Sequence, residues 1–215
     1  DDQGRPWRTD LQLTNTGDDE VVCTLDPLGP EGPLAAPVTV AIPSSATLRL
    51  DDVLDSLFGL DGEVAVRVVP SAPTVVGAGR TYAPTARGTV GQAAPALPEE
   101  TAIWHFAEGR LSGLDRSPTV RSDLGLVSLC DGAMTVDLRL LGPDGGELGR
   151  LAVELPPFAA RTLTDVLPTV GASEVTAASA QLTTDNRCPF LAYSSRVDLT
   201  TGDRVLVPAV AASPD

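Results

Sequence analysis

The chain repeats itself at a fixed interval, and this repeat limits its fold more than any other feature of the sequence. Residues 8–13, Arg-Thr-Asp-Leu-Gln-Leu, return 113 positions later at residues 121–126 as Arg-Ser-Asp-Leu-Gly-Leu. The same offset relates residues 28–32, Leu-Gly-Pro-Glu-Gly, to residues 141–145, Leu-Gly-Pro-Asp-Gly. A period of this length predicts two homologous copies of one domain.

The offset changes toward the end of each copy. The offset is 116 where Arg80 aligns with Arg196, and it is again 113 where Pro95 aligns with Pro208. A chain of 215 residues is long enough for two domains of ordinary size. The two predicted domains are residues 1–98 and residues 99–215.

Both copies have the pattern of an antiparallel β-sandwich. Short runs rich in Val, Leu and Thr are separated by Gly, Pro and Asp. In the first copy we expect strands near residues 8–14, 20–27, 38–42, 46–50, 63–69, 74–82 and 90–96. In the second copy we expect them near residues 121–128, 134–141, 149–155, 160–164, 178–184, 190–197 and 204–210. This density of strands is typical of an all-β, immunoglobulin-like fold, and residues 51–59 are the one predicted helix.

The second copy has an additional apolar segment, Ala-Ile-Trp-His-Phe-Ala-Glu-Gly at residues 102–109, which we interpret as a leader strand. The matching part of the first copy would lie before residue 1. Trp104 and Phe106 are too large and apolar for a flexible linker, so we expect them to pack at the domain junction or to add to a sheet edge. A first copy without its own leader would have an open edge that accepts a strand from another copy.

These motifs resemble a repeat of secreted and cell-envelope bacterial proteins, notably actinobacterial ones. In that repeat an aromatic-Phe-Ala-Glu-Gly strand, similar to residues 104–109, precedes a Leu-x-Leu-x-Asn-Pro-Gly-Asp strand and turn. Residues 11–18 are similar to the second element, with Thr16 where Pro is usual, and the second copy departs further at residues 128–131. The resemblance implies an extracellular β-sandwich array of largely unassigned function, and it implies no activity.

Two of the three cysteines stand where the other copy has a small residue. Cys130 aligns with Gly17 and Cys188 with Ala72. Because both small residues are replaced by cysteine in the same copy, the two positions are expected to face each other, and we predict a Cys130–Cys188 disulfide. The alternative is two unrelated buried thiols. Cys23 falls in a strand and is expected to be a small buried hydrophobe. A disulfide would place the chain in an oxidising compartment, either extracellular or in the cell envelope.

Charge and hydropathy exclude other classes of function. The net charge is −14, and a chain this acidic is repelled by phosphate backbones, so we expect no nucleic-acid partner. No apolar run reaches 18 residues, so we expect no membrane insertion.

Few residues offer catalytic chemistry. His105 is the single histidine, which excludes zinc sites with several histidines, and no serine lies in a Gly-x-Ser-x-Gly elbow. Acidic clusters at residues 18–20, 51–55 and 144–147 could bind calcium, although turn and helix-cap roles account for most of their carboxylates. We therefore predict no catalytic residue, metal site or cofactor.

Four charged positions recur in both copies. An Arg and an Asp two residues apart on a strand project to the same face, which favours ion pairs or an arginine–backbone network. The alternative is a catalytic site duplicated in both halves. The recurring pairs are Arg8/Arg121, Asp10/Asp123, Asp52/Asp165 and Arg80/Arg196.

Together these features predict a non-enzymatic, extracellular module of a bacterial surface or secreted protein. It would act as a rigid tandem-repeat spacer or assembly unit, with other proteins or copies of itself as partners. One alternative is a glycan- or polymer-binding module, and another is a subunit of a strand-addition filament. The aromatic residues available for stacking on sugars are Trp7, Tyr82, Trp104 and Tyr193.

Overall fold

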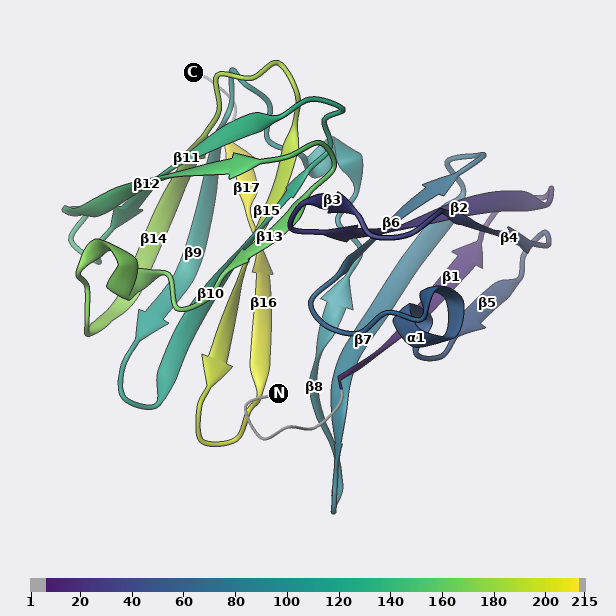
Figure 1. Cartoon of the computed structure of the whole chain (residues 1–215), viewed down its shortest axis with the longest axis horizontal. Helices are drawn as coiled ribbons and strands as arrows, with labels where there is room; N and C mark the ends of the chain where they lie inside the picture. Colours follow the sequence, from purple (N-terminus) through teal and green to yellow (C-terminus); the bar gives the residue numbers. More distant parts are fainter. Residues whose placement is uncertain (1–6, 213–215) are drawn as a thin grey trace. The chain divides into compact units, whose positions relative to one another are not determined.

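The computed structural model describes residues 7–212, and within them the protein is all-β (Figure 1). It divides into two compact units; apart from the short segment 30–32, the chain passes from one to the other between Ala96 and Leu97. Unit 1 comprises the residues up to 29 and residues 33–96, and unit 2 comprises residues 30–32 and the residues from 97 onward.

Unit 2 has two antiparallel sheets, with strand orders β13-β10-β15-β16 and β12-β11-β14-β9-β17. Apolar side chains from both sheets form a single core, in which Leu124, Val136 and Leu182 are fully buried, so the unit is sandwich-like. Its strands are β9 (Glu108–Arg116), β10 (Val120–Ser128), β11 (Met134–Leu141), β12 (Glu147–Leu155), β13 (Ala160–Leu163), β14 (Val175–Thr183), β15 (Phe190–Asp198), β16 (Arg204–Pro208) and β17 (Val210–Ala212).

Unit 1 has one sheet of order β5-β1-β7-β8 and a second in which β2 pairs with β3, β4 and β6. Its core includes Leu13, Leu25 and Ile42, all essentially inaccessible to solvent. Its strands are β1 (Arg8–Asn15), β2 (Val21–Gly29), β3 (Gly32–Pro33), β4 (Val38–Ile42), β5 (Thr47–Leu50), β6 (Ala65–Pro70), β7 (Val75–Thr85) and β8 (Gly88–Pro95).

The described residues also contain three short helical segments. The predicted helix is present as α1 (Val53–Phe58), and it ends at Gly59, whose φ of 62° suits glycine. Two 3₁₀ turns, η1 (Glu99–Thr101) and η2 (Leu167–Val170), lie in unit 2. Within residues 7–212, no helix combines the length and the apolar character that crossing a membrane requires.

The two units arrange their strands in the same order. The sheet β5-β1-β7-β8 corresponds to β13-β10-β15-β16, and β4-β2-β6 corresponds to β12-β11-β14. Positive φ angles recur at the repeat offset of 113, at Ser45 (56°) and Phe158 (51°) and again at Asp52 (47°) and Asp165 (50°). The repeated sequence therefore encodes repeated backbone turns as well as repeated strands.

Strand register corrects the alignment predicted for the arginines. Asp10 lies opposite Arg80 in unit 1, but Asp123 lies opposite Ser195, and Arg196 lies opposite Ser122. The structural offset between β7 and β15 is therefore 115 instead of 116. Because side chains alternate along a strand, this one-residue shift places the two arginines on opposite faces of their sheets.

The predicted leader strand is also corrected. Strand β9 begins at Glu108 instead of residue 102, because Ala107 N donates to Trp104 O at 2.8 Å and closes a turn before it. Between 102 and 107 only Ile103 pairs, in an isolated bridge to Phe190. The role predicted for Trp104 and Phe106, at the domain junction or in strand addition, stays a prediction.

Candidate functional site

The recurring aspartates hold backbone amides. In unit 1, Asp10 Oδ1 accepts a hydrogen bond from Asp52 N at 3.1 Å, and in unit 2, Asp123 Oδ1 accepts one from Asp165 N at 2.9 Å. Both donor residues have a left-handed backbone, which Asp tolerates better than most side chains. Each carboxylate thus fixes the chain as it leaves β5 or β13.

Asp123 carries a further set of partners in unit 2. Asp123 is only 2% exposed. Its Oδ1 lies 3.1 Å from Arg121 Nε, and its Oδ2 lies 3.9 Å from Arg204 Nη1. A carboxylate this buried needs opposite charge and hydrogen-bond donors, and it has both. The predicted pairing of Arg121 with Asp123 is confirmed.

Two more ion pairs lie beside Asp123. Arg116 Nε is 2.9 Å from Asp165 Oδ1, and Arg196 Nε is 2.7 Å from Asp115 Oδ2. Asp115 also accepts the amide of Ala177, another residue with positive φ. We call this group the Arg–Asp cluster; it consists of Asp115, Arg116, Arg121, Asp123, Asp165, Arg196 and Arg204.

Unit 1 satisfies the equivalent carboxylate with different residues. Asp10 lies 3.5 Å from Arg49 Nη2 and accepts a hydrogen bond from Tyr82 OH at 3.4 Å, whereas Arg8 pairs with Asp52 at 3.6 Å. Arg80 instead donates to Thr89 and lies over the Tyr82 ring. The predicted alignment of Arg80 with Arg196 is wrong, because the two arginines occupy different register positions.

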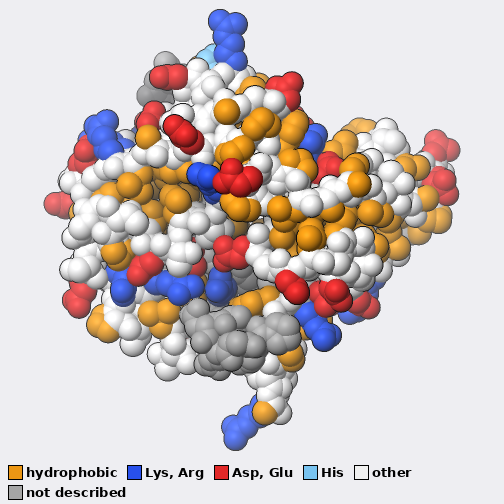
Figure 2. Space-filling view, in the orientation of Figure 1, with side chains coloured by type: hydrophobic (Ala, Val, Ile, Leu, Met, Phe, Trp, Pro, Cys, Tyr) orange, Lys and Arg blue, Asp and Glu red, His pale blue; other side chains and the backbone are white. Residues whose placement is uncertain are grey.

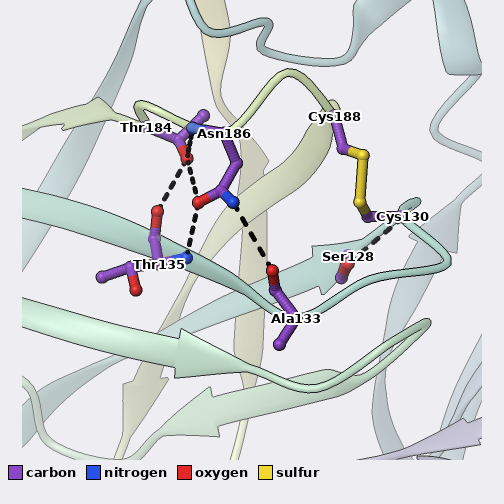
Figure 3. The surroundings of a disulfide bond; sticks show 7 residues. All are labelled: Ser128, Cys130, Ala133, Thr135, Thr184, Asn186 and Cys188. Carbon is purple, nitrogen blue, oxygen red and sulfur yellow. Dashed lines mark hydrogen bonds between the residues drawn. A yellow bond between two sulfur atoms is a disulfide. The ribbon is translucent and has the colours of Figure 1, made fainter.

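The predicted disulfide between Cys130 and Cys188 is present (Figure 3). It links the turn after β10 to the loop before β15. In the same loop, Asn186 Oδ1 accepts from Thr135 N at 3.0 Å, and Nδ2 donates to Ala133 O at 3.4 Å. Among the described residues, the one group with metal-ligand spacing combines these cysteines with Asp131, and both of its sulfurs are committed to the disulfide.

Unit 1 closes the same end with a buried asparagine, which sequence reasoning missed. Asn15 is fully buried; its Nδ2 donates to the carbonyls of Asp19, Ile42 and Pro43, and its Oδ1 accepts from Gly17 N and Thr74 Oγ1. Its position in β1 corresponds to Ser128, whose hydroxyl accepts from Cys130 N. A polar amide at an inward-facing strand position, just before a glycine turn, was the available signal.

The alignment behind the disulfide prediction was off by one residue. Thr16 N donates to Thr74 O, and the matching bond in unit 2 runs from Leu129 N to Pro189 O. Cys188 therefore corresponds to Pro73, one residue beyond the Ala72 of the sequence alignment. The prediction succeeded because Gly17, the counterpart of Cys130, still faces this chain segment: a Cβ there would meet Thr74 at 3.1 Å.

The aromatic residues considered for binding differ in their contacts and in their exposure to solvent. The Tyr193 ring lies where a Cβ on Gly125 would be, at 2.1 Å from Cζ, so the glycine makes room for this cross-strand contact. His105 is exposed in the turn before β9, with its ring 4.4 Å from that of Phe106. Trp104 and Phe106 are 39% and 63% exposed.

The acidic cluster at residues 144–147 is held in local contacts. Glu147 accepts hydrogen bonds from Arg139 and Arg150, which lower the pKa of its carboxyl to about 2, and Asp144 accepts from Gly146 N in its own turn. Cys23 is fully buried, as predicted, and burial raises the pKa of its thiol.

Comparison of the chain with protein-family models, with curated proteins and with solved structures finds no match in any of the three. Function is therefore inferred from the geometry of the two units.

Proposed function

We propose that the chain is a non-enzymatic structural or interaction module of a secreted or cell-surface bacterial protein. Two homologous immunoglobulin-like sandwiches would act as a tandem spacer or assembly unit, with proteins or copies of itself as partners. The observation that carries the proposal is the repeated aspartate of β1 and β10. In both units this carboxylate holds a left-handed backbone amide, a role that stabilises a scaffold.

The charges beside this aspartate support the same role. In the Arg–Asp cluster each carboxylate lies within ion-pair distance of a guanidinium, and those of Asp115 and Asp123 also accept a backbone amide, so their contacts hold neighbouring segments of unit 2 together.

The disulfide supports an extracellular or cell-envelope location. Disulfides are stable in oxidising compartments and rare in the reducing cytoplasm. Cys130 and Cys188 link two segments of unit 2 that are 58 residues apart, which is the arrangement of a stabilising crosslink.

Mass spectrometry of the protein isolated from its producing cells tests this proposal. Alkylation before reduction should leave a Cys130–Cys188 crosslinked peptide in the secreted or envelope fraction. Buried Cys23 is the internal control, because it should be alkylated only after denaturation. Protein found in the cytoplasmic fraction, with Cys130 and Cys188 both alkylated, would contradict the proposal.

Glycan or polymer binding is the second candidate, and the observation in its favour is the exposed pair Trp104 and Phe106 in one turn. Aromatic rings of this kind can stack on sugars. A glycan array probed with the native chain and with a Trp104→Ala/Phe106→Ala variant separates the two functions. Saturable binding that the variant loses would favour the glycan-binding module, whereas the structural proposal predicts no glycan-specific binding.

A further inference from the structure

A carboxylate lies beside the disulfide of unit 2. Asp131 follows Cys130 directly, and a side-chain oxygen of Asp131 lies within 4.8 Å of the sulfurs of both Cys130 and Cys188. Asp131 is exposed, and its carboxylate has no hydrogen-bond or ion-pair partner among residues 7–212. A neutral disulfide gains no bond from a carboxylate at this distance, whereas two thiolates and a carboxylate are a set of zinc ligands.

A backbone hydrogen bond holds the two cysteine-bearing segments together independently of the disulfide. Leu129 N donates to Pro189 O at 3.2 Å. The same bond exists in unit 1, from Thr16 N to Thr74 O at 2.8 Å, although Gly17 stands there at the position of the first cysteine. The turn therefore forms in unit 1 without a crosslink, and we expect reduced unit 2 to keep its two cysteines in place.

The spacing of the cysteines suits one metal ion. Their Cα atoms are 5.3 Å apart. The two thiolates of a tetrahedral zinc site are about 3.7 Å apart, since each Zn–S bond is about 2.3 Å long. Rotation about the Cα–Cβ bonds separates the sulfurs without moving the backbone. Asp131 then supplies the third ligand, and water takes the fourth position.

The ligand set also selects the kind of metal. Thiolates favour zinc and other soft or borderline ions, whereas calcium and magnesium take oxygen ligands. Cys130 is 5% exposed and Cys188 is partly buried, so the thiolates lie where attraction to a cation is stronger than in water. Asp131 is exposed, so the ion can reach the site from solvent.

We propose that the reduced chain binds one zinc ion through Cys130, Cys188 and Asp131, and that zinc and the disulfide are alternative links between the same two segments of unit 2. Reduction by a dithiol or a phosphine adds two electrons and two protons to the disulfide and gives two thiols. Zinc binding then releases the two thiol protons to water, and no electron is transferred. This inference concerns the chain before its thiols are oxidised, and it goes beyond the function proposed above.

Metal titration of the full 215-residue chain tests the inference. The chain is reduced with a phosphine, freed of reductant without air, and titrated with Zn²⁺ or, as a spectroscopic probe, with Cd²⁺. We expect one ion per chain and a thiolate-to-cadmium charge-transfer absorption that the oxidised chain lacks. Zn²⁺ should also raise the urea midpoint of unit 2 in the reduced chain, because an ion that binds the folded state stabilises it.

Two variants distinguish this site from other zinc binding. The net charge is −14, and Figure 2 shows acidic side chains scattered over the visible face, so weak binding to surface carboxylates is expected. Cys130→Ala/Cys188→Ala should keep this weak binding and lose the tight site and the charge-transfer absorption, although buried Cys23 is still present. Asp131→Asn should keep the absorption and bind Zn²⁺ at least about tenfold more weakly, a loss that even groups supporting a metal ligand cause.

The outcomes that would overturn the inference are specific. They are equal zinc affinity of the reduced chain and the double-cysteine variant, unchanged affinity of Asp131→Asn, or no stabilisation of reduced unit 2 by zinc. If reduced unit 2 is unfolded before zinc is added, refolding by the ion supports the inference and its failure to refold contradicts it. None of these results changes the compartment or the disulfide state of the protein isolated from cells, so failure here is distinguishable from failure of the proposed function.

Discussion

Asp123 accepts a hydrogen bond from the backbone N–H of Asp165 at 2.9 Å, and 113 residues earlier Asp10 accepts the same bond from Asp52 at 3.1 Å. The two carboxylates differ in their surroundings. The side chain of Asp123 is 3% exposed and pairs with Arg121, whereas that of Asp10 is 20% exposed. The same hydrogen bond from an aspartate to a backbone amide therefore lies in a buried ion-pair network in unit 2 and in a more solvent-accessible ion-pair network in unit 1.

This difference predicts unequal effects of the same substitution. Asp123→Ala should lower the free energy of unfolding of unit 2 by about 3–5 kcal/mol, because it removes the buried carboxylate that pairs with the partly buried Arg121 and Arg204 and accepts the amide of Asp165. Asp10→Ala should cost unit 1 about 1 kcal/mol. Urea unfolding followed by tryptophan fluorescence measures the two free energies. In a Trp7→Phe background Trp104 reports the unfolding of unit 2, and in a Trp104→Phe background Trp7 reports that of unit 1. Equal losses in the two units would contradict the prediction.

The buried amide of Asn15 predicts a large effect from a residue without charge. Asn15→Ala removes the partner of three carbonyls and of Gly17 N, so it should destabilise unit 1 by about 2–3 kcal/mol. Thr14→Ala is the neighbouring control, because Thr14 makes only an exposed hydroxyl contact to Thr47 and should cost about 0.5 kcal/mol or less. Similar melting temperatures for the two variants would show that Asn15 does not hold this end of the unit.

The disulfide should stabilise one unit only. Cys130→Ser with Cys188→Ser should lower the stability of unit 2 by about 4 kcal/mol, the value expected in the chain-entropy model for a loop closed by residues 58 apart. The unfolding midpoint of unit 1, whose Cys23 is outside the disulfide, should not move. A shift of both units together would contradict independent stabilisation.

Glu147 predicts a pH effect with a defined sign. Hydrogen bonds from Arg150 and Arg139 lower the pKa of its carboxyl from 4.5 to about 2. Because the folded-state pKa is below the unfolded one, its stabilising contribution is complete above about pH 4.5 and is lost as the pH falls toward 2. A carbon-detected NMR titration should give Glu147 a midpoint near 2, rising toward 4.5 in an Arg139→Gln/Arg150→Gln variant. A native midpoint near 4.5 would refute it.

Much of the strand pattern could be predicted because it depends on local sequence. Alternating apolar residues and Gly/Pro turns marked each repeated strand, and the repeat itself aligned Asp10 with Asp123. The Arg121–Asp123 pair followed from their spacing on one strand, since alternate side chains share a face.

What depends on pairing between distant segments could not be predicted. The shift from 116 to 115 between β7 and β15 leaves no local trace, yet it decides which face carries Arg196. The sequence predicts this strand six residues early because Trp104 and Phe106 suggest a strand, whereas the residues of β9 that the core buries are Leu111 and Leu114. Asn15 was missed because its hydrogen-bond partners come from three separate parts of the chain.

Within the described residues 7–212, unit 1 repeats the strand order of unit 2, but β6 lacks the second neighbouring strand that β9 gives to β14. Native-state hydrogen exchange measured by NMR at single amides tests it most directly, comparing β6 (Ala65–Pro70) with β14 (Val175–Thr183) in the same sample. We predict that amides of β14 exchange only on unfolding of unit 2, whereas alternate amides of β6 that point away from β2 exchange at least a hundredfold faster than their β2-bonded neighbours, by an order-of-magnitude estimate. Uniform protection along β6, equal to that of β14, would contradict the claim.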